Sequence, residues 1–363
     1  MNVGDRAAAH DGERRKVPPV WVRLVAGIAV SGALLFLALA RVNLASLLEQ
    51  VARANYGLLM AAVVCYFLDL ALRSLRWSVL LRAKHWVSPV RLYPALTIGY
   101  MANNLLPARI GDLSRAYLVR RRDGISASTV FASVALERLI DGITVVLLLV
   151  LILPSIPHVA WFGNLVWGAT GVFGLALLVC IFFVSVRRVW SKAFLRAIVV
   201  VPPSLRIRVI DVVDKFFQGL QVLRSAKHIV AIAMLSVLIW LLGAVTYILV
   251  AGAFDIRLSL AQAVAAICVV NLATAIPLAP ASIGSFDLAA ITIFTVLGLS
   301  PDVASGVALG LHAVLFFPPV LVGLIFLWRE DLSLGQLYGD ASDYSKASGS
   351  GGSTPVGVGT RPV

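Results

Sequence analysis

The stretch that decides the fold is residues 260–299, LAQAVAAICVVNLATAIPLAPASIGSFDLAAITIFTVLGL. It is apolar nearly throughout, but it is far too long for one crossing of a hydrocarbon core of roughly 30 Å. Pro277 and Pro280 interrupt it near its middle, because proline lacks the N–H group that a helix interior needs. We therefore expect a helical hairpin that enters and leaves the membrane on the same side.

The composition places most of the chain in lipid. Of the 363 residues, 60% are hydrophobic and 13% are charged, about half the charged share of a soluble domain. The mean hydropathy is +0.93. The net charge of +13 comes from residues in short loops between apolar runs, as in a multi-pass membrane protein, and not from a basic face on a soluble body. This pattern argues against nucleic acid as a partner and favours anionic lipid head groups.

Six other apolar runs are long enough, or nearly long enough, to cross a bilayer. They are residues 22–40, 57–72, 132–153, 162–184, 229–252 and 303–327. The first could instead be a cleaved signal peptide, since Ala38, Leu39 and Ala40 resemble a cleavage site, but the many later runs favour an uncleaved helix.

A shorter apolar stretch, residues 92–106, would be about 22 Å long as a helix and is followed by Pro107. Arginines flank it on both sides, so both flanks are expected in the cytoplasm and the stretch should be a re-entrant hairpin from that side. The hairpin at residues 260–299 has flanks with little positive charge and should enter from outside. The prediction is an all-α polytopic membrane protein with six full crossings, two re-entrant hairpins and both termini in the cytoplasm.

The two halves, residues 21–153 and 162–329, are then inverted repeats. PARIGDL at residues 107–113 matches PASIGSF at residues 280–286, and Asn104 and Asn271 precede the two tips. Inverted repeats with broken helices are typical of transporters that bind substrate at the repeat interface. Outside this membrane domain of residues 21–329, residues 1–20 and 340–363 are expected to be disordered cytoplasmic tails. Within it, residues 187–227 are expected to form a basic amphipathic connector on the inner leaflet.

Several polar residues could bind an anionic head group. Gly111 and Gly284 at the hairpin tips would leave backbone N–H groups open, and Arg109 and Arg115 add positive charge beside the first tip. The alternative is that these arginines only anchor a cytoplasmic loop.

Charged residues inside predicted helices are the strongest signal. Glu137, Arg138 and Asp141 lie within one helix, where each charge facing lipid would cost roughly 2.5–3.5 kcal/mol. They either fix helix packing as an internal salt bridge or line a polar cavity in which Arg138 binds phosphate and the acids carry protons.

Two further groups extend this polar set. Asp69, Arg73 and Arg76 share a helix face at spacings of four and seven residues, although snorkelling alone could explain the arginines. His312 occupies nearly the position in the second repeat that Arg138 occupies in the first. A lone membrane histidine is otherwise often a packing residue.

At these motifs the chain resembles the transmembrane-domain family of lysylphosphatidylglycerol synthases, also called flippase-like or UPF0104 membrane proteins. The resemblance runs from about residue 23 to residue 329 and rests on four motifs. They are RxxRW at residues 73–77, NxxPxRxGDxxR at residues 104–115, ERxxD at residues 137–141 and PxxPxxIGxFD at residues 277–287. The family often has glutamate at the positions of Asp112 and Asp287, and glycine at Ala281 and Ser282.

The resemblance implies movement or handling of a polar or isoprenoid lipid, with Asp112 among the charge-pairing residues. The chain ends shortly after the last crossing, so we expect no soluble synthase domain and no synthesis of lysylphosphatidylglycerol.

We expect a translocase of a phosphate-bearing lipid in a prokaryotic plasma membrane. The alternatives are an integral-membrane transferase acting on a lipid-linked substrate, with Glu137 or Asp141 as general base, and a scaffold for lipid-synthesis enzymes. No protease, hydrolase, nucleotide-binding or dinucleotide-binding motif is present, and Cys65, Cys180 and Cys268 read as packing residues. We therefore expect no cofactor and no metal. Membrane lipids are the expected partners, with lipid-biosynthesis enzymes and a second copy of the chain left open.

Overall fold

The computed structural model describes residues 44–82, 86–106, 110–125, 127–156, 160–185, 225–275 and 282–332. Within these residues every regular element is a helix, as predicted. The elements are α2 Leu44–Arg53, α3 Tyr56–Leu81, α4 Pro89–Leu105, α5 Ile110–Asp123, α6 Ala127–Ile152, the short 3-10 helix η2 Leu153–Ser155, α7 Ala160–Ser185, α10 Ala226–Ala253, α11 Leu260–Ala273, α12 Ser285–Val296 and α13 Pro301–Arg329. The predicted run at residues 22–40, the two tails and most of the connector at residues 187–227 lie outside the described residues.

Five of the predicted apolar runs coincide with long helices. Three of these helices, α3, α10 and α13, are long and apolar enough to cross a membrane by length and composition. Helices α6 and α7 have 26 residues each and are therefore about 39 Å long. The number of crossings stays a prediction.

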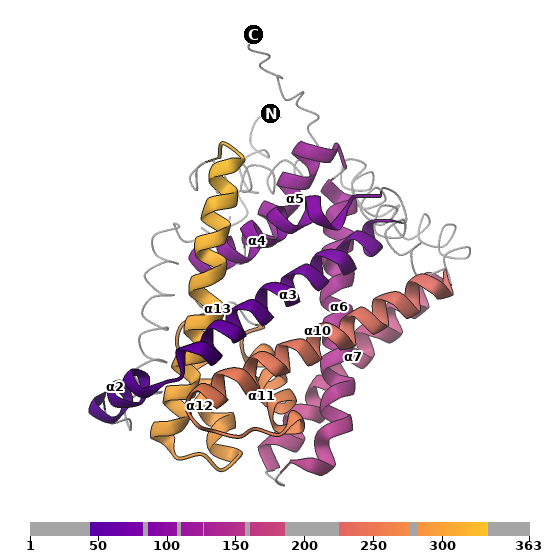
Figure 1. Cartoon of the computed structure of the whole chain (residues 1–363). Helices are drawn as coiled ribbons and strands as arrows, with labels where there is room; N and C mark the ends of the chain where they lie inside the picture. Colours follow the sequence, from indigo (N-terminus) through magenta and orange to yellow (C-terminus); the bar gives the residue numbers. More distant parts are fainter. Residues whose placement is uncertain are drawn as a thin grey trace, which may run out of the picture.

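Helices α3 and α10 lie side by side in opposite directions across the molecule (Figure 1). The N–H of Asn55, just before α3, donates to the carbonyl of Ala253 at the end of α10 over 2.8 Å. The Asn55 side chain also accepts from the N–H groups of Gly57 and Leu58, which α3 would otherwise leave open. This antiparallel pair joins the two halves of the chain.

Helices α4 and α5 form a helical hairpin whose outer ends meet. Arg91 near the start of α4 lies 3.7 Å from Asp123 at the end of α5. Where the helices cross, a Cβ on Gly99 would lie 3.0 Å from the carbonyl oxygen of Gly111, and a Cβ on Gly111 would overlap the Gly99 carbonyl. Two glycines therefore permit this backbone contact.

This hairpin is longer than predicted. The basic segment after residue 106 was expected to be a cytoplasmic flank, but it forms α5, the second arm of the hairpin. Hydropathy misses α5 because of its arginines, one of which is buried and paired inside the molecule.

Helices α11 and α12 form the second short pair, in the predicted stretch 260–299. Ser259 and Gln262 form a capping box at the start of α11, and Gly284, with φ of +83°, precedes α12. The ring of Phe254, which follows α10, packs against Gly310 of α13. Helices α11 and α12 lie at one end of the molecule (Figure 1). That end lies opposite to the outer ends of α4 and α5 (Figure 1). The arrangement fits an inverted repeat, and insertion of the two hairpins into a bilayer stays a prediction.

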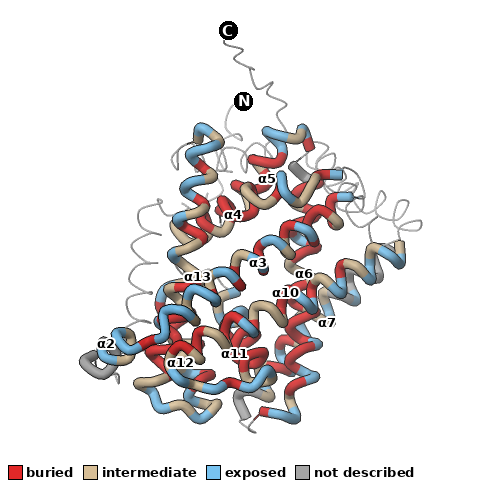
Figure 2. The backbone as a smooth tube through the Cα atoms, viewed as in Figure 1, coloured by how far each residue is buried: buried red, intermediate tan, exposed pale blue. Residues whose placement is uncertain are grey.

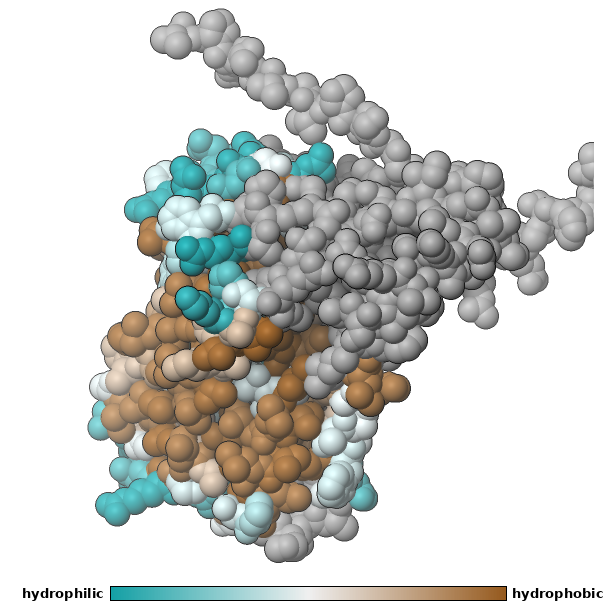
Figure 3. All heavy atoms as spheres, turned by 90° about the vertical axis from the view of Figure 1, so that its right-hand side faces the viewer, coloured by the Kyte–Doolittle hydropathy of each residue, from teal (hydrophilic) through white to brown (hydrophobic). Residues whose placement is uncertain are grey.

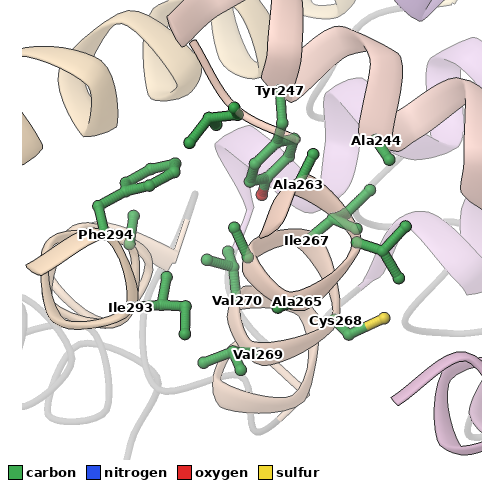
Figure 4. Packing of buried hydrophobic residues seen from close by; sticks show 14 of the residues in the cluster. Ala244, Tyr247, Ala263, Ala265, Ile267, Cys268, Val269, Val270, Ile293 and Phe294 are labelled. Carbon is green, nitrogen blue, oxygen red and sulfur yellow. The ribbon is translucent and has the colours of Figure 1, made fainter. Parts of the chain in front are cut away.

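Buried residues gather along the contacts between helices (Figure 2). One apolar cluster surrounds α11 and is closed by small residues of that helix, such as Ala263 and Ala265, and by the rings of Tyr247 and Phe294 (Figure 4). A second cluster joins α3, α4, α5 and α6 around Trp77. Cys65 and Cys268 are buried free thiols, consistent with packing roles, and the Cys180 side chain lies outside the described set.

Large apolar side chains also cover much of the exterior. On the face shown in Figure 3 they form a continuous region below hydrophilic residues at the upper end. Over the described residues as a whole, exposed examples include Met60, Val64 and Leu68 on α3 and Leu321 and Ile325 on α13. An apolar exterior of this kind is what contact with lipid requires.

Candidate functional site

The polar face of α3 begins with an ion pair between residues four apart. Arg73 donates from Nε to Asp69 Oδ2 over 2.6 Å, and Nη2 donates to Oδ1 over 3.5 Å. The two side chains share a helix face because their spacing is close to one turn. Both are largely removed from the surface, so the pair lies within the helical bundle.

Arg76, one turn further along α3, is completely buried and joins three helices. Its Nη1 donates to Asp141 Oδ1 of α6 over 2.6 Å and to Ser236 Oγ of α10 over 3.0 Å. Its Nη2 lies 3.5 Å from Glu137 Oε1. A buried arginine is tolerated only where acids and hydrogen bonds replace its hydration, and Arg76 has both.

Arg115 of α5 is equally buried and forms the second tie between helices. Its Nη1 donates to Glu137 Oε2 and its Nη2 faces Asp112 Oδ1, both over 3.1 Å. Its guanidinium carbon lies 5.1 Å from the centre of the Trp77 ring, a cation–π contact. Trp77 in turn donates to Ser133 of α6 over 3.0 Å. The hairpin α4–α5 is thereby bound to α3 and α6.

Arg138 differs from the other arginines of this group. It lies 3.6 Å from Glu137, 3.8 Å from Asp112 and 4.0 Å from Asp141, and these contacts are ion pairs without hydrogen bonds. Its side chain is 40% exposed, whereas that of Glu137 is 1% exposed. Arg138 is therefore the member of the group that keeps donors open at the surface of the bundle.

We call these eight residues the ion cluster. Its members are Asp69, Arg73, Arg76, Asp112, Arg115, Glu137, Arg138 and Asp141. Four positive and four negative side chains give it a formal charge of zero, which is the condition for burying so many charges among apolar helices. The structure thus brings together eight predicted substrate, coupling or charge-pairing residues from α3, α5 and α6, Asp112 among them.

The first hairpin tip is closed by a side chain that the sequence did not single out. The N–H of Gly111, at the start of α5, donates to Asn103 Oδ1 over 2.9 Å. The predicted residue was its neighbour Asn104, which is half-buried. Arg109 lies outside the described residues.

The second tip has an acidic cap. The N–H of Gly284 donates to Asp287 Oδ2 over 3.0 Å, and the other oxygen of Asp287 lies 2.9 Å from His312 Nδ1 on α13. Asn271 instead bonds its own helix, donating to the carbonyl of Ile267 over 2.8 Å. The N–H groups of Gly111 and Gly284 are therefore both already bonded to side chains.

A family model described as the lysylphosphatidylglycerol synthase TM region matches residues 24–323. The chain belongs to this family. The resemblance inferred from the four sequence motifs is thereby confirmed.

Among the relatives of this family member are two UPF0104 membrane proteins of Methanothermobacter thermautotrophicus. One is 27% identical over 71% of this chain and 80% of its own length, and the other is 23% identical over 82% and 90%. A protein of Haloferax volcanii named glycosyltransferase AglD is 25% identical over 81% of this chain but only 52% of its own length. This chain therefore spans about half of AglD. No solved structure matches the chain.

Three contacts of this family member could not be read from the sequence. Ser236 is an ordinary helical serine until α10 packs on α3, and Asn103 was overlooked beside Asn104. Asp287 belongs to the family motif at residues 277–287, but its pairing with His312 depends on how α12 packs against α13. The Arg76–Ser236 and Asp287–His312 contacts join different helices, 160 and 25 positions apart in sequence, so residue spacing carries no information about them.

Proposed function

We propose that the protein is a lipid translocase that moves a phosphate-bearing lipid across the plasma membrane of a prokaryote. The observation that carries the proposal is the exposure of Arg138, whose side chain is 40% exposed and makes only ion pairs of 3.6–4.0 Å, whereas Arg76 and Arg115 beside it are buried and hydrogen-bonded to acids. A phosphate group offers the oxygen acceptors that a guanidinium fork binds.

The pairing within the ion cluster assigns different roles to its arginines. Arg76 and Arg115 are each bonded to acids at 2.6–3.1 Å and have no exposed surface to offer a head group. They tie the helices together and hold Glu137 and Asp141. Those acids in turn keep Arg138 in place without closing its donors, so Arg138 meets the head group while the tails of the lipid stay outside the bundle.

The surrounding architecture supports movement. The family contains membrane proteins, and the two hairpins are attached at opposite ends of the molecule, as in transporters built from inverted repeats. A site beside one hairpin could therefore be opened toward either side by shifting the hairpin against α3 and α6.

The test is translocation of fluorescent phosphatidylglycerol in vesicles that contain the purified protein. Arg138→Gln should abolish movement, since glutamine keeps a polar side chain that can donate hydrogen bonds but removes the positive charge and the guanidinium fork. Arg53→Gln is the matched control, because Arg53 is exposed and its partner Glu49 lies on the same short helix. Movement by folded Arg138→Gln at the wild-type rate would contradict the proposal.

A transferase acting on a lipid-linked substrate is the second candidate, and the name of the relative AglD favours it. Against it, Glu137 and Asp141 are held by arginines, which leaves neither in the position of a free general base. Mass spectrometry of lipids incubated with the protein separates the two functions: a transferase produces a lipid of altered mass, and a translocase leaves the lipid unchanged.

A further inference from the structure

The buried acids of the described chain fall into two kinds. Asp69, Glu137 and Asp141 are paired with arginines, which stay charged at any physiological pH. Asp287, also buried, is paired with His312 instead. Histidine is the side chain that changes charge near neutral pH, so this pair is the buried ion pair that can gain and lose a proton.

The geometry of the pair defines where a proton binds. An ionised carboxylate only accepts hydrogen bonds, so Nδ1 of His312 carries hydrogen and donates to Asp287 Oδ1 over 2.9 Å. The other ring nitrogen, Nε2, is then the basic atom. The rings of Phe286 and Phe316 lie 4.9 Å and 6.1 Å from the imidazole, and the His312 side chain keeps 16% of its surface exposed. The imidazole of His312 thus lies beside two aromatic rings and keeps part of its surface exposed.

Other charged groups lie on the helices that pack around the pair, but within the described residues neither Asp287 nor His312 makes an ion pair with any of them. Helix α11 carries only the thiol of Cys268, and α12 carries only Asp287 itself. On α13, Asp302 and Arg329 lie about 15 Å and about 26 Å along the helix from His312.

The remaining ionisable groups belong to helices that contact α13. They are Glu49 and Arg53 on α2, Tyr56, Cys65, Tyr66, Asp69, Arg73 and Arg76 on α3, Arg91, Tyr93 and Tyr100 on α4, and Lys227, His228 and Tyr247 on α10. Glu49 of α2 and Asp69 of α3 each form an ion pair with an arginine on the same helix. The charge of the Asp287–His312 pair is therefore governed chiefly by the pair itself.

We propose that Asp287 and His312 form a proton-binding site that couples lipid movement to a proton gradient, an inference that rests on the proposed translocase function. A proton from water on one side adds to His312 Nε2 and gives an imidazolium beside the Asp287 carboxylate. The same proton later leaves Nε2 to water on the other side. No other bond forms or breaks, so the cycle balances.

The pair is linked to the second hairpin tip through Asp287. Its Oδ2 accepts the N–H of Gly284, whose positive φ marks a backbone turn that most residues avoid. Protonation of His312 adds the attraction between an imidazolium and the Asp287 carboxylate to the hydrogen bond that joins them at 2.9 Å. Protonated His312 therefore holds the start of α12 against α13 more firmly than neutral His312 does, and proton release loosens the tip.

The experiment uses full-length protein in vesicles of phosphatidylethanolamine and phosphatidylglycerol, with fluorescent phosphatidylglycerol as the probe. A difference of one pH unit should sustain an asymmetry of the probe of about tenfold between leaflets if one proton moves per lipid. His312→Gln and Asp287→Asn should still move lipid but lose this asymmetry. His228→Gln, which changes the other histidine among the described residues, should keep it. Persistence of the full asymmetry in folded His312→Gln would overturn the proposal.

A second measurement separates this site from the proposed function. Nitrogen-15 spectra of the histidines in the full-length protein, assigned by comparison with His312→Gln, should show that the His312 imidazole takes up a proton when the pH is lowered. Asp287→Asn should change the spectrum of this imidazole at a given pH, because the carboxylate that accepts from Nδ1 is lost. If the wild type moves no lipid, the proposed function fails, and the spectra alone decide on the proton site. An imidazole that does not titrate, or does not respond to Asp287→Asn, overturns the proposal in either case.

Discussion

Replacing Arg76 by leucine tests how the ion cluster holds the helices together. Arg76 is fully buried and bonds Asp141 over 2.6 Å and Ser236 over 3.0 Å, with Glu137 at 3.5 Å. Leucine fills part of the space but leaves the acids of α6 with one positive charge fewer. Removing one partner of a buried ion pair costs roughly 3–5 kcal/mol.

Arg115 and Arg138, which stay beside the acids of α6, decide how much of this free energy of unfolding is lost. Arg115 lies 3.1 Å from Glu137, and Arg138 lies 4.0 Å from Asp141, so neither acid becomes wholly unpaired. We expect Arg76→Leu to lower the free energy of unfolding by about 3 kcal/mol, the lower end of the range. The double variant Arg76→Leu with Asp141→Leu restores neutrality and should return to within about 1 kcal/mol of wild type, since an apolar pair can replace a buried ion pair.

Unfolding in mixed micelles of a non-ionic detergent and dodecyl sulfate, followed by circular dichroism, measures these differences. The control is Arg53→Leu, which breaks an exposed pair with Glu49 and should change stability by less than about 0.5 kcal/mol. A loss below about 1 kcal/mol for Arg76→Leu, or a double variant as unstable as the single one, would refute the idea that charge balance holds the cluster.

Two other changes probe single contacts. Gly111→Ala should destabilise the protein by about 1–3 kcal/mol, because the added Cβ meets the Gly99 carbonyl and the Asn103 side chain. The control is Gly168→Ala in α7, which has open space around it and should be neutral or stabilising. Thermal unfolding of both variants in detergent checks this, and equal melting temperatures would contradict the close crossing. Ser236→Ala should cost about 1 kcal/mol by removing one hydrogen bond of Arg76, and unchanged stability in the same micelle assay would show that this bond contributes nothing.

Much of the helical framework could be predicted from hydropathy alone. The runs at residues 162–184 and 229–252 correspond to α7 Ala160–Ser185 and α10 Ala226–Ala253, because a long apolar segment in lipid must satisfy its backbone groups as a helix. The break within residues 260–299 was also predicted, since two prolines lie between α11 and α12.

The bounds of helices that contain charged residues were predicted less well. The run at residues 57–72 was ended before Arg73, whereas α3 continues to Leu81 and carries Arg73 and Arg76 inside the bundle. Helix α5 was taken for a loop for the same reason. Hydropathy treats every arginine as exposed to solvent, and it cannot register an acid on another helix that neutralises the charge.

The amino-acid order alone thus determined the helical class, the family, the two interrupted stretches and the set of polar residues that had to avoid lipid. Tertiary structure alone decided which acid meets which arginine, that Arg115 is buried while Arg138 stays open, and that Asp287 meets His312. The physical reason is the distance along the chain over which each effect acts. Hydropathy and helix breaking act between neighbours in sequence, whereas an ion pair such as Arg76 with Asp141 joins residues 65 positions apart and exists only after the helices have packed.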